Sequence, residues 1–182
     1  THGSSNRDKK GAVRPSREQT ARVIDRLAHV LPQLIEALAF LHGHGVVHRA
    51  LKPNNVMVNQ LGMVKVLDFG LLAEFQNLKH DDLAVMGTPS YMAPEQILGK
   101  APSPATDVYA LGAMLFRLIA GRPVFYGRID TFKDTVLKQK PLRLSQLVDG
   151  VPSYLEEACA HMLSKSPSAR PTLVELAEEL LP

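Results

Sequence analysis

A regular apolar repeat follows the polar first residues of the chain and leaves little choice of secondary structure there. Ser16, followed three residues later by Gln19, forms the capping-box pattern that begins many helices. Apolar residues then recur at intervals of three and four, which is the spacing of one helical face: Val23, Leu27, Val30, Leu31, Leu34, Ile35, Leu38 and Leu41. Pro32 predicts a bend within this helix, and Gly43 with Gly45 predicts its end.

Only one short part of the chain has the pattern of β-strands. Residues 46–48, the segment VMVNQ and the segment MVKVL are strand-like, and a turn at Leu61-Gly62 separates the last two. After this region periodicity is lost until about residue 92, which predicts a long loop. Helical patterns then return over residues 105–120, 129–139, 153–164 and 172–181. We therefore expect a mainly α domain with a small β insertion that carries polar loops.

Composition and charge disfavour several functional classes. The chain has 182 residues, of which 45% are hydrophobic and 21% charged, as in ordinary globular proteins. The formal net charge is +3, but residues 1–26 alone contain seven basic and three acidic residues, a net +4. This arm has no aromatic side chain that could stack on bases, so we expect no nucleic-acid partner.

The cellular location is suggested by three features. Cys159 is the single cysteine, which excludes an internal disulfide and suits a reducing compartment. Residues 1–15 lack the apolar core of a signal peptide. The most apolar stretch, residues 110–121, is too short to span a bilayer and contains Arg117. We expect a cytoplasmic protein with no membrane segment in this chain.

Five motifs in order resemble those of protein kinases. HRALKPNN at 48–55 is similar to the catalytic loop, LDFG at 67–70 to the metal-binding DFG motif, and GTPSYMAPE at 87–95 to the P+1 loop with its APE. DVYALG at 107–112 resembles the motif that opens the central helix of the C-terminal lobe (C-lobe). Arg170 stands where the family keeps an arginine that pairs with the APE glutamate, here Glu95.

The resemblance implies a domain organisation and a class. Residues 1–15 are expected to be a basic, flexible lead-in, and 16–182 a kinase C-lobe of the Hanks-type, bacterial-like serine/threonine class. Within it lie the catalytic loop at 48–55, DFG at 68–70, the activation and P+1 loop at 71–95, and a helical subdomain at 105–181. Lys52 followed by a proline, rather than the small residues of tyrosine kinases, is typical of the serine/threonine class.

Phosphoryl transfer needs hard oxygen ligands for Mg²⁺ and a cation on the moving phosphate. Asn55 and Asp68 supply such oxygens at the ends of two adjacent β segments, and Lys52 is a mobile charge for the γ-phosphate of ATP. By resemblance, Met57 forms the floor of the nucleotide site. The alternatives are weaker: Asp68 alone could be a turn aspartate, and the histidines at 42, 44 and 48 could suggest a metal cluster.

Other roles come from the resemblance alone. Thr88 is expected to bridge Lys52 and the catalytic aspartate. His48 is expected to pack against Phe69, and Asp107 to hold the catalytic-loop backbone by hydrogen bonds. The P+1 pocket, which would favour a hydrophobic residue after the target in the protein substrate, is expected to be lined by Val85, Pro89 and Met92.

The loop at 71–86 contains no serine, threonine or tyrosine. An arginine before the catalytic residue, here Arg49, usually pairs with a phosphate in this loop. We therefore expect Asp82, with Asp81, to pair with Arg49 in place of the phosphate. A solvated acidic loop without this pairing remains an equal alternative.

Ala50 occupies the place of the aspartate that accepts or orients the proton of the substrate hydroxyl. Losing such a base costs about 10²- to 10⁴-fold in rate, so the chain as written is expected to be inactive. No glycine-rich phosphate loop and no lysine of the VAIK type is present, which predicts that the N-terminal lobe (N-lobe) is missing from this chain. That lobe, in cis or in trans, is the expected partner. Dimerisation through the exposed cleft face is a further expectation.

Two hypotheses follow from Ala50. In the first, an active serine/threonine kinase has had its catalytic aspartate replaced. In the second, the protein is a natural pseudokinase that binds nucleotide or partners without transferring phosphate. Because the other family positions match, the first is favoured; they are Lys52, Asn55, Asp68, Gly70, Thr88, Glu95 and Arg170.

Overall fold

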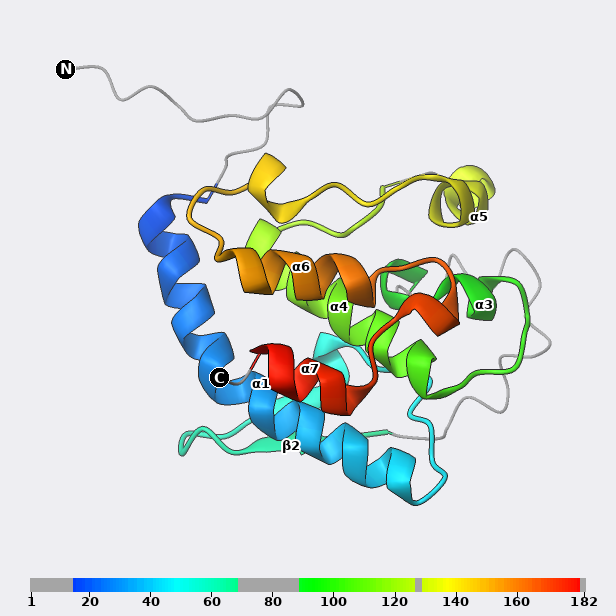
Figure 1. The fold of residues 1–182 in the computed structure, drawn as a ribbon, viewed down its shortest axis with the longest axis horizontal. Helices are drawn as coiled ribbons and strands as arrows, with labels where there is room; N and C mark the ends of the chain where they lie inside the picture. The colour runs from blue at the N-terminus through cyan, green and yellow to red at the C-terminus, as the bar shows by residue number, and fades with distance from the viewer. Residues whose placement is uncertain (1–14, 69–88, 127–128, 181–182) are drawn as a thin grey trace.

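The computed structural model describes residues 15–68, 89–126 and 129–180. Helices dominate these ranges, and a small hairpin lies at one edge of the helical body (Figure 1). In chain order the elements are α1 (Arg17–Gly43), η1 (Pro53–Asn55), β1 (Val56–Val58), β2 (Val64–Val66), η3 (Pro89–Tyr91), α3 (Pro94–Ile97), α4 (Pro104–Ala120), α5 (Ile129–Lys138), η4 (Leu144–Gln146), α6 (Ser153–Met162), η5 (Pro167–Ala169) and α7 (Leu173–Leu180). The expected mainly α domain with a small β insertion is confirmed for the described part of the chain.

Helix α1 begins and bends where its sequence predicts. Ser16 and Gln19 form the capping box, with the Ser16 N–H donating to Gln19 Oε1 at 2.8 Å. Figure 1 shows that α1 changes direction partway along its length, and Pro32 lies inside the helix. Proline lacks an N–H and crowds the preceding turn, which explains the bend. The Gln33 side chain supports this turn by donating to the His29 carbonyl at 2.9 Å.

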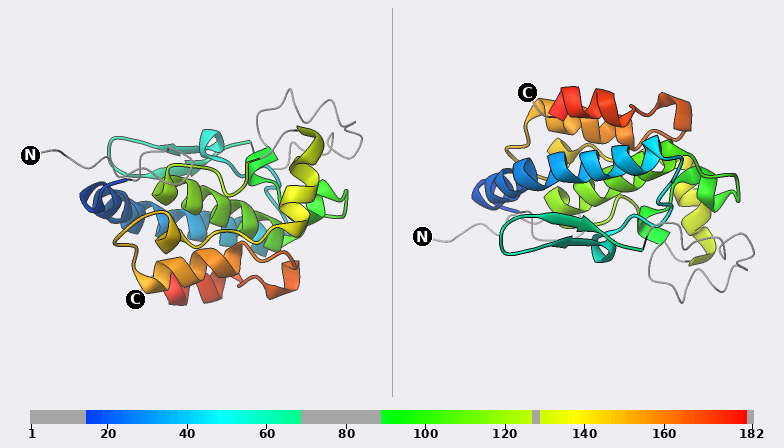
Figure 2. Two further views of the ribbon diagram at one scale, coloured as in Figure 1. Left: turned by 90° about the horizontal axis from the view of Figure 1, so that it is seen from above. Right: turned by 90° about the horizontal axis from the view of Figure 1, so that it is seen from below.

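Helix α4 is the centre of the molecule, with 13 of its 17 residues buried. It packs against α6 on one side and α1 on another, and α7 covers both α1 and α6. The two views of Figure 2 show α6 and α7 on one side of α1 and α4, and the hairpin on the other. Gly112 lets α6 approach closely, since a Cβ there would lie 2.6 Å from the Met162 Cβ.

The two strands form an antiparallel hairpin in which Val56 pairs with Val66, and Val58 with Val64. Its turn is closed by the Asn59 side chain, which accepts hydrogen bonds from the N–H groups of Leu61 and Met63 at 2.9 Å. The expected strands over VMVNQ and MVKVL are therefore confirmed, although each is shorter than its segment.

The expected strand at residues 46–48 is wrong. In the described part of the chain these residues have no strand structure. The Val46 N–H donates to the Leu41 carbonyl at 2.9 Å and so closes the end of α1, whereas the His48 N–H donates to the Asp107 carboxylate at 2.7 Å. The Val46 N–H therefore bonds to the end of a helix and the His48 N–H to a side chain, so neither is available for a strand partner.

Within the described ranges, no helix combines the length and the apolarity that crossing a membrane requires.

Candidate active site

The HRALKPNN loop lies between the end of α1 and the start of β1, and Asp107 near the start of α4 holds it in place. Asp107 is completely buried. Its Oδ2 accepts hydrogen bonds from the His48 N–H at 2.7 Å and from His42 Nε2 at 2.8 Å, and its Oδ1 accepts from the Arg49 N–H at 2.8 Å. These contacts match the role that the sequence resemblance assigns to Asp107.

The backbone around position 50 has an unusual conformation that neighbouring side chains stabilise. Arg49 has a φ of 68°, in the left-handed region that a non-glycine residue rarely adopts. The Ala50 N–H donates to His48 Nδ1 at 3.3 Å, and the Ala50 carbonyl accepts from Asn55 Nδ2 at 2.9 Å. The loop therefore presents the side chain of residue 50 from a firmly held backbone, and that side chain is a methyl group.

The backbone that carries the two candidate metal ligands lies at the open end of the hairpin. The Leu67 N–H donates to the Asn55 carbonyl at 2.8 Å, which extends the pairing of β1 and β2 by one step. Asp68 follows directly, with a φ of 56° and an exposed side chain. Because Asn55 uses its Nδ2 in the bond to Ala50, its Oδ1 is the atom that could act as a hard oxygen ligand.

This donor set fits Mg²⁺ carried by a nucleotide better than a metal held by protein alone. Mg²⁺ is usually bound by one or two side-chain oxygens, with phosphates and water completing the octahedron. In the ranges that the structure describes, no group of three or more histidine, cysteine, aspartate or glutamate side chains could hold a metal ion. Two of the three histidines of the alternative cluster have other partners here: His42 contacts Asp107 and His44 contacts the Phe40 carbonyl.

Glu95 of α3 and Arg170 form a buried, bidentate ion pair. Arg170 Nη1 and Nη2 donate to the two Glu95 carboxylate oxygens, each at 2.7 Å. The Thr106 hydroxyl also donates to Glu95, at 2.9 Å, and the Arg170 guanidinium stacks over the Tyr109 ring, 4.9 Å from its centroid. Burial raises the pKa of Glu95, but the bonds from Arg170 outweigh it, so the pKa is lowered overall. The pairing expected from the sequence is present.

Gln96, the residue after Glu95, joins α3 to the loop at residues 48–55. Its Oε1 accepts from the Ala93 N–H at 3.0 Å, and its Nε2 donates to the Arg49 carbonyl at 2.8 Å. Sequence reasoning missed this residue. The only signal available was its position next to the APE motif, and that position does not reveal a partner 47 residues away.

His48 is fully buried, and its Nε2 has no hydrogen-bond partner in the parts of the chain that the structure describes. The ring is thus held by packing and by its Nδ1 contact with the Ala50 N–H. Its expected neighbour Phe69 lies outside the described residues, as do Asp81, Asp82, Val85 and Thr88, and the side chain of Pro89. Met92 is described and is partly buried between η3 and α3. Lys52 is partly buried at the N-cap of η1.

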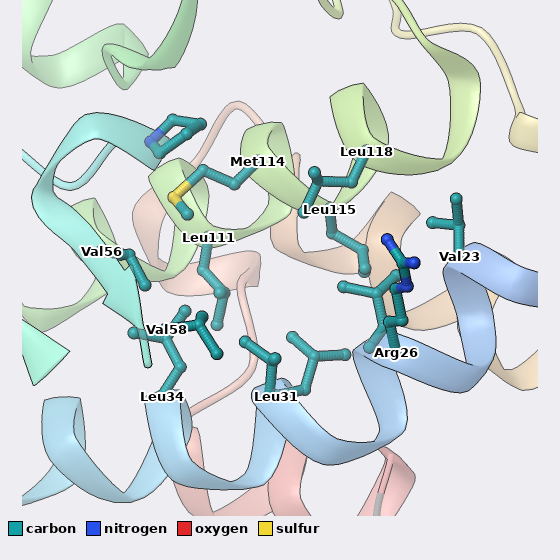
Figure 3. A pocket seen from close by; sticks show the side chains of 13 residues that line it. Val23, Arg26, Leu31, Leu34, Val56, Val58, Leu111, Met114, Leu115 and Leu118 are labelled. Carbon is teal, nitrogen blue, oxygen red and sulfur yellow. The ribbon is translucent and has the colours of Figure 1, made fainter. Parts of the chain in front are cut away.

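Met57, the expected floor of the nucleotide site, lies on β1 with 57% of its surface exposed. Its neighbours Val56 and Val58 take part in an apolar pocket of about 310 Å³ between α1, the hairpin and α4 (Figure 3). Hydrocarbon side chains line this pocket, with Arg26 as its charged member. It lacks the oxygen ligands that phosphates and Mg²⁺ require, so it is separate from the candidate site at Asn55 and Asp68.

Comparison with known proteins agrees with this geometry. The family model described as "Protein kinase domain" matches residues 10–181. The chain belongs to the protein kinase family.

Its relatives are serine/threonine kinases from bacteria and animals. The chain is 32% identical to serine/threonine-protein kinase PknB of Mycolicibacterium smegmatis over 161 residues, which is 86% of this chain and 26% of that protein. It is 44% identical over 96 residues, 52% of this chain, to the DNA damage-responsive serine/threonine-protein kinase RqkA of Deinococcus radiodurans, of which it covers 14%. It is 31% identical to serine/threonine-protein kinase PLK4 of Xenopus tropicalis over 172 residues, 94% of this chain and 17% of that protein. The chain therefore spans about a quarter or less of each relative.

Proposed function

We propose that this chain is the C-lobe of a serine/threonine protein kinase whose catalytic loop is assembled but lacks its proton acceptor. The observation that carries the proposal is the backbone around Ala50. Asp107 holds the preceding N–H of Arg49 and Asn55 holds the Ala50 carbonyl, at the cost of a left-handed conformation at Arg49. A strained backbone persists only where the surrounding structure enforces it, and such strain is concentrated at functional sites. Similarity to serine/threonine kinases supports the class.

Protein kinases use ATP with Mg²⁺, which neutralises the charge that develops on the transferred phosphoryl group. In this chain we assign Asn55 and Asp68 to the metal-bound nucleotide, with Lys52 as the cation for the γ-phosphate. The backbone bond between Leu67 and Asn55 supports the assignment, because it places the residue before Asp68 opposite Asn55 at the open end of the hairpin. Met57 is assigned to the floor beneath the base, and its exposed side chain is available for that contact.

The acceptor is proposed to be a serine or threonine hydroxyl of a protein. In the family pattern, an aspartate at position 50 accepts or orients its proton. The methyl group of Ala50 cannot do so, and a lost base costs about 10²- to 10⁴-fold in rate, or about 3 to 5 kcal/mol in barrier. Thr88, the P+1 residues Val85, Pro89 and Met92, and the pairing of Asp82 with Arg49 remain parts of this proposal.

The proposed partner that completes the nucleotide site is an N-lobe, in cis or in trans. Apolar side chains on the hairpin support it, because Met57, Leu61 and Met63 are each half exposed or more. Exposed apolar side chains are candidates for contact with a partner. Self-association through the same face is the competing use of this surface. A cytoplasmic location is also a proposal, suggested by the single, buried Cys159.

A natural pseudokinase is the second candidate, and Ala50 itself is the observation that favours it. The Ala50→Asp reversion separates the two. Transfer of labelled phosphate from ATP would be measured with the N-lobe restored, for the chain as written and for the reversion in parallel. Transfer only in the reversion supports a disarmed kinase. If neither protein transfers phosphate while both bind Mg-ATP, the proposal fails and the pseudokinase function stands.

A further inference from the structure

We propose that Gln96 is a positioning residue that fixes the peptide bond presenting side chain 50, and that it couples this peptide to α3. The inference rests on the proposed function, since it concerns the same loop. The bridge consists of two hydrogen bonds from one amide group: Ala93 N–H to Oε1 at 3.0 Å, and Nε2 to the Arg49 carbonyl at 2.8 Å.

The orientation of the Gln96 amide is determined by its partners. The Ala93 N–H is a donor and must face the amide oxygen, whereas the Arg49 carbonyl is an acceptor and must face the NH₂ group. The reversed amide would set donor against donor and acceptor against acceptor. A carboxylate could make the first contact but not the second, because it has no proton to donate at neutral pH.

The Arg49 carbonyl and the Ala50 N–H belong to one peptide unit. Gln96 holds the carbonyl end, and His48 Nδ1 accepts from the N–H end at 3.3 Å. The next peptide is held through the Ala50 carbonyl by Asn55. Both peptide units that flank the Cα of residue 50 are thus fixed by side chains, so the direction of its Cα–Cβ bond depends on Gln96.

Gln96 belongs to a different element of the fold from the other side chains that hold this loop. His48 and Asn55 belong to the loop itself, and Asp107 belongs to the central helix α4. Gln96 belongs to α3, which follows the P+1 segment and is anchored at the neighbouring residue by the buried Glu95–Arg170 pair. A shift of α3 would therefore move the Arg49–Ala50 peptide. In this way a movement of the P+1 segment would change the direction of side chain 50.

The first test uses amide hydrogen exchange, measured by NMR on the chain as written. Gln96→Glu keeps the acceptor for the Ala93 N–H but sets a carboxylate oxygen against the Arg49 carbonyl. Exchange of the Ala50 amide is expected to become about tenfold faster at neutral pH, the loss that corresponds to one hydrogen bond. Gln19→Glu is the matched control, because Gln19 accepts from the Ser16 N–H in a similar cap at the exposed start of α1. It should leave Ala50 unchanged.

Acidification supplies a readout that a purely structural role would not give. Once protonated, the carboxyl group introduced by Gln96→Glu can again donate to the Arg49 carbonyl. The Ala50 exchange ratio between this variant and the parent should therefore return toward one as the pH falls. Gln96→Met cannot donate at any pH, and its ratio should stay high. An unchanged Ala50 rate in Gln96→Glu, or an equal acceleration at amides throughout α1 and α4, overturns the proposal.

The second test measures kinetics in the Ala50→Asp background with the N-lobe restored. Adding Gln96→Glu is expected to lower kcat by about 10- to 100-fold with little change in the KM for ATP, because misplacing a catalytic group penalises the chemical step. A raised KM with unchanged kcat contradicts the positioning role. If the Ala50→Asp protein itself transfers no phosphate, the proposed function fails, while the exchange experiment still decides the role of Gln96.

Discussion

The Asp107 carboxylate accepts a hydrogen bond from the Arg49 N–H at 2.8 Å while Arg49 has a φ of 68°. The same carboxylate accepts from the His48 N–H at 2.7 Å. Two consecutive N–H groups therefore converge on one buried side chain from the central helix. This relationship connects the buried central helix α4 with a residue of the candidate site in the left-handed region, and it explains how the loop keeps a conformation that it would not adopt alone.

Replacing Asp107 by asparagine should destabilise the protein by about 3 kcal/mol. The amide NH₂ group would face a backbone N–H in a fully buried position and leave it unsatisfied. Urea unfolding measures the loss. Asp134→Asn is the matched control, because Asp134 forms an exposed pair with Lys138, and it should change stability by less than about 0.5 kcal/mol. Equal effects in the two variants would contradict the role given to Asp107.

Replacing Glu95 by glutamine should cost about 3 to 5 kcal/mol, since it leaves the buried Arg170 charge without its partner. Glu157→Gln, which breaks an exposed pair with Arg143, should cost less than about 1 kcal/mol. Chemical unfolding of both variants at neutral pH makes the comparison. Similar losses of unfolding free energy in the two variants would show that the buried Glu95–Arg170 pair stabilises the protein no more than the exposed pair does.

The Glu95 pair also predicts a pH dependence. The pKa of Glu95 is lowered in the folded protein, so the unfolded chain binds its proton first as the pH falls below about 4.5. Stability from this group is therefore complete at neutral pH and is lost on acidification through the folded pKa. The difference in unfolding free energy between the parent and Glu95→Gln should shrink across that acidic range. A constant difference would be inconsistent with the lowered pKa.

Replacing Gly112 by alanine should destabilise the protein by about 1 to 3 kcal/mol. The new Cβ would meet the Met162 Cβ at 2.6 Å, and a Cβ cannot move without its backbone, so α4 and α6 must separate. Gly43→Ala is the control, since a Cβ there meets nothing within 4 Å. It should be neutral or stabilise the end of α1 slightly. Thermal unfolding of both variants would reveal whether close helix approach is the cause.

Replacing Gln33 by methionine should loosen the hairpin that carries Asn55 and Asp68. The Gln33 amide donates to the Gly62 carbonyl at 2.9 Å and accepts from the Val64 N–H at 3.0 Å, so it fastens the hairpin to α1. Hydrogen exchange at Val64 should become about tenfold faster. Gln60→Met, at an exposed position of the hairpin turn, should leave that rate unchanged. If the two variants behave alike, Gln33 does not fasten the hairpin.

Local pattern was sufficient for the longer helices and the hairpin, but not for the short helix α3, which the sequence analysis did not predict. The capping box at Ser16 and Gln19, the apolar spacing of α1 and the turn between the two strands each involve residues only a few positions apart. The expected strand at 46–48 was wrong. Two valines favour extended backbone, but the Val46 N–H donates to the Leu41 carbonyl and the His48 N–H donates to the distant Asp107.

The sequence by itself determined the protein kinase resemblance, the helical fold class, the presence of Asn55 and Asp68 and the missing carboxylate at Ala50, because motifs and periodicity are local properties of the chain. The resemblance predicted that Asp107 holds the loop backbone, but only the tertiary structure decided that Gln96 holds the Arg49 carbonyl, which it reaches from 47 residues away. A hydrogen bond between such distant residues leaves no periodic trace, and it forms only when packing of α3 and α4 brings donor and acceptor within about 3 Å.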